Sequence, residues 1–213
     1  MPSTPSLLTF DIFGTVIDWR RGLVEAALTH GIQVGDREFD AVIDHQARAE
    51  AGAYRPYVDI LAESLTGVLR MERRAARAIA AKAGRWPLFS DSADAIRTLM
   101  RVAPCVAMTN SDQDHGVQVQ HQLGFRLSGW ICAEDVRCYK PAAEFWIAVA
   151  SRRRKEFGPS WWHVSAYADY DHETAGRLGL TTVFIPRPHS RWGPSAVTAA
   201  DLRALATSLG GGS

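Results

Sequence analysis

The sequence predicts an α/β fold, and three observations lead to this prediction. Short apolar runs of strand length alternate with stretches in which apolar residues recur at helical spacing, a pattern typical of parallel βαβ units. The region 20–86, between the first and the second run, is instead rich in Ala, Glu and Arg. Polar residues follow directly after the runs. We therefore expect a Rossmann-like parallel sheet core with an inserted helical cap domain.

Four apolar runs predict buried strands: Leu7–Phe10, Cys105–Met108, Trp161–Ala166 and Thr181–Ile185. Four further stretches predict helices: Ser92–Arg101, His115–Leu123, Ala142–Lys155 and His172–Leu178. In open parallel sheets, ligands bind beyond the carboxyl ends of the strands. The polar residues that follow the strands should therefore surround one crevice.

The inserted region is predicted to be helical. Apolar residues at Val58, Leu61 and Leu65 recur at helical spacing, and Pro56 suits the first turn of a helix. We expect an α/β core domain of residues 1–18 and 87–209 and a helical cap domain of residues 19–86. The closing residues 210–213, Gly-Gly-Gly-Ser, are predicted to form a flexible tail.

The composition argues against several classes of partner. With 24 Lys and Arg against 23 Asp and Glu, the formal net charge is +1, so no overall field would recruit nucleic acid or an anionic membrane. The apolar runs are far shorter than the roughly 20 residues that span a bilayer. Three cysteines without metal-site spacing, and a beginning without a signal-peptide pattern, indicate a cytoplasmic protein. A homodimer is possible, and candidates for a partner surface are Trp130, Trp161, Trp162 and Trp192, although large aromatic residues are more often core.

The strongest local signal is the segment 11–18, Asp-Ile-Phe-Gly-Thr-Val-Ile-Asp. Asp11 directly follows the first predicted strand, and Gly14 permits a sharp turn that exposes the carboxylate to a substrate. The hydroxyl of Thr15 and neighbouring amides can stabilise charge there. The alternative is an ordinary strand followed by an Asx-type turn.

With these residues the sequence resembles the haloacid dehalogenase superfamily, whose first motif is a nucleophilic aspartate followed by two residues and Gly-Thr. Three further matches occur in the order that the family shows. Thr109 and Asn110 resemble the second motif, Lys140 the third and Asp171 the fourth. The resemblance implies that Asp11 is the nucleophile, that Lys140 balances its charge, and that Asp171 holds Lys140 or orients water.

Each later motif has an alternative interpretation. Thr109 and Asn110 could cap the following helix, and Asp171 could be an N-cap of its own helix. Lys140 in isolation is more typical of a surface loop. Asp169 is a rival to Asp171 for the fourth motif.

The residue two places after Asp11 distinguishes the branches of the family that the chain resembles. Phosphatases of the superfamily have a second aspartate there, the general acid for an alkoxide leaving group, whereas this chain has Phe13. A phenyl ring transfers no proton, and a halide leaving group needs none. The resemblance is therefore to the 2-haloacid dehalogenase branch. It implies hydrolysis of short 2-haloalkanoic acids to 2-hydroxy acids through an ester on Asp11, with inversion at C2 and without a metal or cofactor.

The residues that the resemblance assigns to substrate binding are Phe13, Thr15, Arg48, Thr109, Asn110 and Trp146. The two threonines would bind the substrate carboxylate, the asparagine and a cap arginine the departing halide, and Trp146 would form an apolar wall. Spacing does not select the arginine among Arg37, Arg48 and Arg55, and we expect Arg48.

One departure from the branch concerns the second step of the reaction. The branch has small polar residues shortly before the fourth-motif acid, where this chain has Ala166, Tyr167 and Ala168. The positioning of water for ester hydrolysis therefore stays open. Two other functions stay open with it: a magnesium-dependent phosphatase of the same superfamily, and a non-catalytic binding protein with the same fold.

Overall fold

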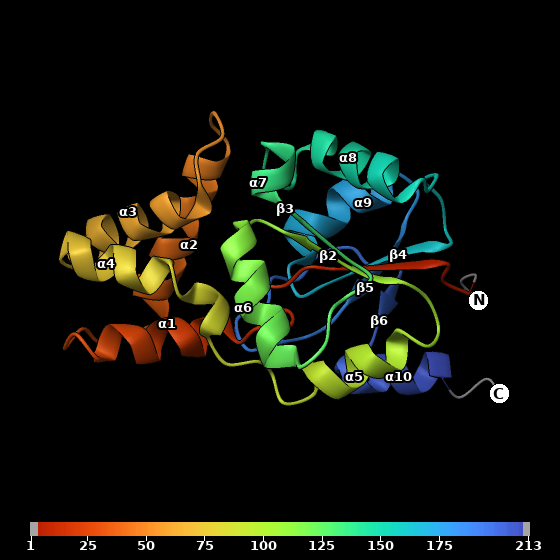
Figure 1. Ribbon diagram of the computed structural model, residues 1–213, viewed down its shortest axis with the longest axis horizontal. Coiled ribbons are helices and arrows are strands. Elements are labelled where there is room, and N and C mark those ends of the chain that lie inside the picture. Colours follow the sequence, from red (N-terminus) through yellow and green to blue (C-terminus); the bar gives the residue numbers. More distant parts are fainter. Residues whose placement is uncertain (1–3, 211–213) are drawn as a thin grey trace.

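The computed structural model describes residues 4–210, and its core is a six-stranded parallel sheet (Figure 1). The strand order is β3-β2-β1-β4-β5-β6. The strands are β1 (Leu7–Phe10), β2 (Cys105–Thr109), β3 (Gly129–Cys132), β4 (Trp161–Ser165), β5 (Thr181–Phe184) and β6 (Val197–Thr198). This architecture confirms the predicted α/β class.

Helices cover both faces of the sheet, which explains why its four central strands are buried and mainly apolar. Every residue of β1, β2, β4 and β5 is buried. Helices α8 and α9 lie on one face, and α5 and α10 on the other (Figure 1). The core helices are α5 (Ser92–Leu99), α6 (Gln113–Leu123), α7 (Ala133–Val136), α8 (Ala143–Arg153), α9 (Glu173–Arg177) and α10 (Leu202–Gly210).

The topology opens a crevice at the end of β1. This strand pairs with β2 on one side and β4 on the other, so that Leu8 lies opposite both Cys105 and Trp162. From β1 the chain proceeds to β2 and β3, and then returns to β4 on the opposite side of β1. Such a change of direction leaves space beyond the carboxyl ends of the two central strands. Because Asp11 is the first residue after β1, the topology places it at this crevice.

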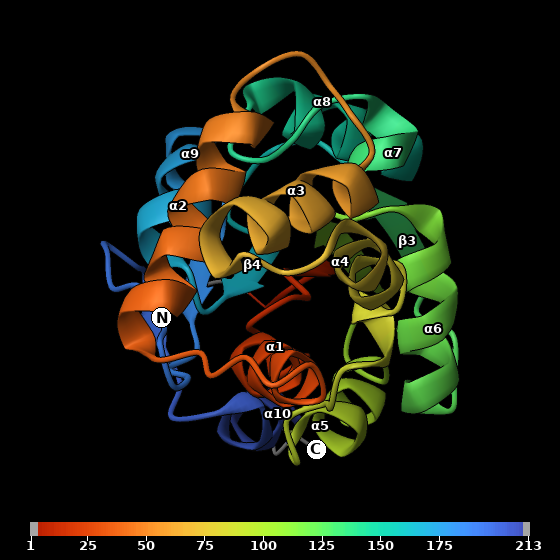
Figure 2. The same ribbon diagram turned by 90° about the vertical axis from the view of Figure 1, so that its left-hand side faces the viewer.

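The region between β1 and α5 folds into helices that lie to one side of the sheet (Figures 1 and 2). They are α1 (Trp19–Leu28), α2 (Asp36–Glu50), α3 (Tyr57–Leu69), α4 (Arg73–Ala80) and the short 3₁₀ turn η1 (Ala83–Arg85). Helix α3 packs against both α2 and α4. We call residues 19–86 the inserted helices; their separation as a cap domain stays a prediction.

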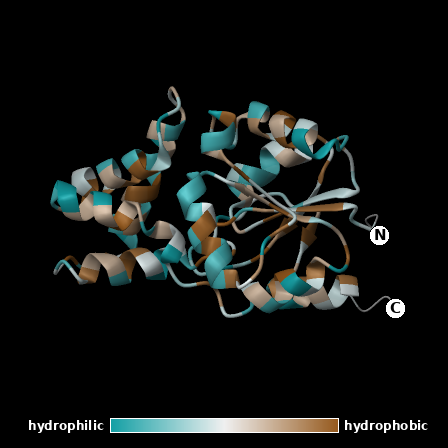
Figure 3. Cartoon of the chain, viewed as in Figure 1, coloured by the Kyte–Doolittle hydropathy of each residue, from teal (hydrophilic) through white to brown (hydrophobic). Residues whose placement is uncertain are grey.

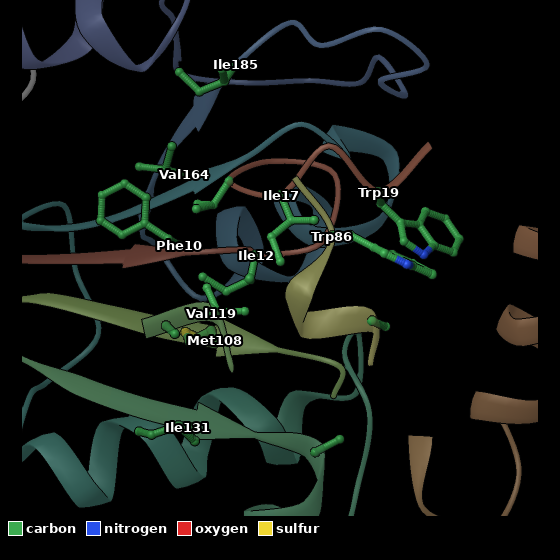
Figure 4. Packing of buried hydrophobic residues seen from close by; sticks show 14 of the residues in the cluster. Phe10, Ile12, Ile17, Trp19, Trp86, Met108, Val119, Ile131, Val164 and Ile185 are labelled. Carbon is green, nitrogen blue, oxygen red and sulfur yellow. The ribbon is translucent and has the colours of Figure 1, made fainter. Parts of the chain in front are cut away.

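Apolar packing and polar contacts join the inserted helices to the core. Trp19 and Trp86 belong to the same buried cluster as Phe10 of β1 (Figure 4). At the crevice, the carboxylate of Asp112 accepts hydrogen bonds from the backbone nitrogens of Tyr57 (2.9 Å) and Val58 (2.8 Å). The start of α3 is thereby held by an acid of the core, which suits the partial positive charge of a helix N-terminus.

The predicted core elements agree with the structure to within two residues at each end, but strands β3 and β6 and helices α7 and α10 were missed. Strand β3 begins at Gly129 and is half-exposed at its start, and β6 has two residues, so neither forms an apolar run. Pro56 is the N-cap of α3 rather than part of its first turn. Gly210 belongs to α10 instead of the predicted tail, and residues 211–213 lie outside the described residues.

The tryptophans proposed for a dimer surface differ in exposure. Trp161 and Trp162 are buried in β4, whereas Trp192 is 68% exposed and contacts Phe184 with its ring. Figure 3 shows hydrophobic and hydrophilic residues alternating along the helices, as expected for helices that pack with one face. Within residues 4–210, no helix has both the length and the apolar character needed to cross a membrane.

Candidate active site

Asp11 lies where β1 passes into a tight turn. Gly14 has a φ of +96°, which side chains disfavour, and a Cβ there would lie 2.4 Å from Cε2 of Tyr167. The glycine therefore permits both the turn and the close approach of the tyrosine ring. Thr15 Oγ1 donates a hydrogen bond to Asp11 Oδ2 (2.7 Å) and accepts one from the backbone nitrogen of Ala166 (2.9 Å). The threonine thus orients one oxygen of the carboxylate and ties the turn to the end of β4.

The ammonium group of Lys140 lies between two carboxylates. The residue is 2% exposed, and its Nζ is 3.1 Å from Oδ1 of Asp11 and 2.9 Å from Oδ2 of Asp171. Burial opposes the charge of the lysine, but the two carboxylates outweigh it and raise the pKa of Lys140. Burial also opposes the charge of Asp171, yet Lys140 and His163 lower the pKa of that carboxyl group. For Asp11 burial prevails and raises the pKa, so Asp11 is the more basic of the two carboxylates.

Asp171 is placed by a single turn of π-helix, η2 (Ala168–His172), between β4 and α9. Such turns are rare and occur frequently at functional sites. Nε2 of His163 lies 3.3 Å from Asp171 Oδ2, and its Nδ1 lies 2.9 Å from Thr9 Oγ1. Burial lowers the pKa of His163, so the ring is neutral at pH 7. Lys140 and His163 together hold Asp171 in place.

A cavity of about 110 Å³ lies beside the Asp11 carboxylate. The core contributes Asp11, Phe13, Thr109, Asn110, Lys140, Tyr167, Tyr170, Asp171 and Arg191 to its lining. The inserted helices contribute Trp19, Ile43, Gln46, Ala47, Glu50 and Tyr57. The rings of Phe13 and Tyr57 lie 6.0 Å apart and form an apolar wall. The strand ends and the inserted helices thus enclose one small site.

Glu50, the last residue of α2, is a site residue that sequence reasoning missed. Asn110 Nδ2 lies 2.9 Å from Glu50 Oε2, 2.8 Å from the Tyr170 hydroxyl and 3.0 Å from the carbonyl oxygen of Lys140. The Tyr170 hydroxyl contacts Glu50 Oε2 at 3.1 Å and also donates to the Lys140 carbonyl. Burial raises the pKa of Glu50 to about 7, although these neighbours lower it. Nothing in the sequence distinguishes Glu50 from the other acids of a charged helix.

The predicted arginine, Arg48, does not reach the cavity. Helix α2 faces the cavity with residues at positions i, i+3, i+4 and i+7, namely Ile43, Gln46, Ala47 and Glu50. Arg48 lies off this stripe and is exposed, so its assignment to substrate binding is wrong. Its two rivals, Arg37 and Arg55, are exposed as well and do not line the cavity.

The arginine that does line the cavity is Arg191, from the loop after β5. It lies 3.3 Å from Asp44 of α2 and 4.0 Å from Asp169 of η2. Arg191 therefore links the inserted helices to the core at the edge of the site. Sequence reasoning missed it because it looked for the cation within the inserted helices.

Two further substrate-binding assignments require correction. Trp146 is buried in α8, where its ring packs edge-on against His163 at 4.6 Å, and it lies behind the Asp171 carboxylate rather than at the cavity wall. Thr15 also lies outside the lining, because its hydroxyl is engaged by Asp11. Thr109 and Asn110 do line the cavity, but the amide hydrogens of Asn110 are directed to protein acceptors.

The structure distinguishes Asp171 from its rival Asp169. The side chain of Asp171 is 1% exposed and contacts Lys140, whereas that of Asp169 is 41% exposed. The N-cap of α9 is His172 rather than Asp171, and the N-cap of α6 is Asp112 rather than Thr109 or Asn110. Five of the predicted groups, those of Asp11, Thr15, Asn110, Lys140 and Asp171, therefore meet in one connected cluster.

A family model of haloacid dehalogenase-like hydrolases matches residues 5–158. No curated protein sequence matches the chain. Among solved structures, a defluorinating L-2-haloacid dehalogenase is 22% identical, with a TM-score of 0.82 over 98% of this chain and 99% of that chain. The L-2-haloacid dehalogenase from Xanthobacter autotrophicus is 14% identical, with a TM-score of 0.83 over 98% of this chain and 100% of that chain; its form with covalently bound chloropropionic acid gives the same values. A magnesium-bound protein from Bacillus subtilis, described as a HAD-hydrolase, is 15% identical, with a TM-score of 0.79 over 97% of this chain and 99% of that chain. These likenesses show a shared fold.

Proposed function

Because the chain belongs to the haloacid dehalogenase-like hydrolases, we propose that it hydrolyses the carbon–halogen bond of short 2-haloalkanoic acids. The product is a 2-hydroxy acid, and the intermediate is an ester on Asp11. The observation that carries the proposal is the surroundings of Asp11: a paired carboxylate faces a small cavity, and the turn behind it supplies Phe13 instead of an acid. This arrangement suits a leaving group that departs as a stable anion, such as halide. The fold shared with L-2-haloacid dehalogenases supports it.

In the first step an oxygen of Asp11 attacks C2 of the substrate from the side opposite the halogen. The new carbon–oxygen bond forms while the carbon–halogen bond breaks, the halide leaves with the bonding electron pair, and C2 inverts. Lys140 keeps Asp11 ionised before the attack. After the attack Asp11 is a neutral ester, but Lys140 retains Asp171 as a partner, so its buried charge stays compensated.

The cavity suits a small monoanion with an apolar part. A cavity of roughly 150 Å³ holds a benzene molecule, so the 110 Å³ beside Asp11 is of the order that a haloacid of two or three carbons requires. Phe13 and Tyr57 provide the apolar surface, and Arg191 provides the charge that a substrate carboxylate requires.

The proposal is tested by incubating the protein with 2-chloropropionate and with fluoroacetate in the presence of a metal chelator. We expect halide release and formation of the 2-hydroxy acid, together with a transient ester on Asp11 in the intact mass of the protein. Absence of halide release with both substrates would contradict the proposal. An ester that forms without turnover would indicate a binding protein instead.

Arg191→Gln is expected to raise the KM for 2-chloropropionate by about 10- to 100-fold with a smaller change in kcat. The expected size follows from the loss of a hydrogen bond to a charged group, which is worth about 1.5–3 kcal/mol. Steady-state halide release measures both constants. The matched control is Arg48→Gln, which changes an exposed arginine of α2 and should leave KM unchanged. An increase of KM in the control alone would restore Arg48 to the site.

A second candidate follows from Glu50. Its pKa of about 7 would allow it to protonate an alkoxide leaving group, which a phosphatase requires and Phe13 cannot do. The similarity to a magnesium-bound HAD-hydrolase belongs with this alternative. Against it, the carboxylates of Asp11 and Asp171, which a magnesium ion would need as ligands, already share the ammonium group of Lys140. Turnover of p-nitrophenyl phosphate that depends on magnesium and is lost in Asp11→Asn would favour the phosphatase.

A further inference from the structure

The second step of the proposed reaction requires a base. Water must attack the ester carbon of Asp11, and a proton must leave that water and reach the oxygen of the departing hydroxy acid. Three carboxyl groups line the cavity, those of Asp11, Glu50 and Asp171. Asp11 is consumed as the ester, so the base is one of the other two.

Asp171 is poorly suited to accept a proton. Its Oδ2 lies 2.9 Å from Lys140 Nζ and 3.3 Å from His163 Nε2. Both neighbours favour the ionised form and lower the pKa of the carboxyl group far below neutral pH. When Asp11 becomes an ester, the charge of Lys140 is left to Asp171 alone, which makes Asp171 a still weaker base.

Glu50 has the opposite environment. It occupies the C-terminal end of α2, where the helix dipole disfavours negative charge. The contacts among Asn110, Tyr170, Glu50 Oε2 and the Lys140 carbonyl are five in number. The Asn110 amide supplies two hydrogens and the Tyr170 hydroxyl supplies one, so only three of the five contacts can be hydrogen bonds when Glu50 is ionised. A proton on Glu50 would supply the hydrogen for a fourth. Within residues 4–210 the other oxygen, Oε1, makes no hydrogen bond.

The position of Glu50 also gives its proton a route to solvent. Glu50 lines the cavity that holds Asp11, and together with Tyr170 it lines a second pocket on the outer side of the site. The proton that Asp11 loses at the end of the cycle can therefore leave through the second pocket.

We propose that Glu50 is the general base of the second step, supplied to the core by the inserted helices. Its carboxylate takes a proton from water as the water oxygen bonds to the ester carbon of Asp11. When the tetrahedral intermediate collapses, the bond between that carbon and the alkyl oxygen breaks, and Glu50 returns the proton to the alkoxide. Asp11 is released as a carboxylic acid, which passes its proton to the Glu50 carboxylate and from there to solvent, so that the ionised Asp11 again pairs with Lys140. This inference rests on the proposed dehalogenase function.

The protonation state of Glu50 in the free enzyme carries over to the ester state. Formation of the ester removes the charge of Asp11 but attaches the carboxylate of the substrate, so the number of negative charges in the cavity is unchanged once halide has left. The titratable groups that face Glu50 are Asp11, Lys140, Tyr57, Tyr139 and Tyr170. Burial raises the pKa of each tyrosine further above its usual value, and Asp11 does not titrate while it is an ester, so Glu50 is the carboxyl group of this set that is free to titrate in the second step.

The test is a single-turnover reaction of the Glu50→Gln variant with 2-chloropropionate. Halide release should remain within a few-fold of the wild-type rate, whereas ester hydrolysis should slow by about a hundredfold or more, the usual contribution of a general base. The ester on Asp11 should therefore accumulate in the intact mass. The matched control is Glu63→Gln, which removes a charge from an exposed glutamate of α3 and should hydrolyse the ester at the wild-type rate.

The pH profile separates a catalytic from a structural role. In the wild type, ester hydrolysis should rise with pH through about 7, as Glu50 loses its proton, and then level off. Glu50→Gln should lack this rise. Hydrolysis at the wild-type rate in Glu50→Gln, an equal slowing of both steps, or a rise that persists in the variant would each overturn the proposal. If the wild type itself forms no ester and releases no halide, the proposed function fails instead.

Discussion

Asp11→Asn is expected to lower kcat for halide release by about a thousandfold or more. The amide is neutral and a weak nucleophile, and the Phe13 ring beside it cannot replace the lost carboxylate. The ester on the side chain of residue 11 should be absent from the intact mass. Folding should be affected much less, because Lys140 retains Asp171 at 2.9 Å. Halide release, intact mass and thermal unfolding measure these three outcomes.

The matched control for this variant is Asp94→Asn. Asp94 lies on α5, away from the crevice, and its side chain is 90% exposed. Its turnover should equal that of the wild type. Halide release by Asp11→Asn at more than about a tenth of the wild-type rate would show that another group is the nucleophile.

Lys140→Met is expected to abolish measurable turnover and to lower the free energy of unfolding by about 3–5 kcal/mol at pH 7. Methionine fills a similar volume but leaves the carboxylates of Asp11 and Asp171 without the cation that both contact. The pKa of Asp11, already raised by burial, should rise further and reduce the ionised fraction of the nucleophile. Denaturant unfolding and single-turnover halide release measure the two effects.

The stability loss in Lys140→Met should depend on pH with a defined sign. The native pKa of Asp171 is lowered by Lys140, so its contribution to stability is present above the unfolded-state pKa of about 3.9 and is lost as the pH falls through the native pKa. The difference from the wild type should therefore be largest near neutral pH and shrink in acid. Lys82→Met, at an exposed position, should show no such difference. A loss of unfolding free energy that is the same at pH 7 and at pH 3 would contradict the ion pair between Lys140 and Asp171.

The site residues of the core could be predicted from the sequence because their positions depend on patterns a few residues long. Asp11, Asn110 and Asp171 each follow a buried strand within a few residues, and parallel strands bring their carboxyl ends to the same edge. Phe13 and Lys140 were identified through a family resemblance that the family model confirms. Errors within the core involved Trp146 and Thr15, whose neighbours depend on packing that no local pattern reveals.

The part of the site that comes from the inserted helices was not predictable. Which face of α2 meets the cavity depends on how α2, α3 and α1 pack on the core, and a rotation of about 100° per residue separates Ala47 from Arg48. Glu50 and Arg191 have no sequence signal of their own, since each gains its position from contacts with residues more than a hundred positions away.

By itself the sequence determined the parallel sheet, the order of the motifs and the absence of an acid two places after Asp11, because strand periodicity and turn residues act over a few positions. Only the tertiary structure showed that Lys140 contacts two carboxylates. It also showed that Arg191, rather than Arg48, lines the cavity together with Glu50. These features depend on distances between side chains far apart in the chain. The packing of the inserted helices against the strand ends sets those distances. The same packing determines the burial and the neighbours that shift the pKa values of the site.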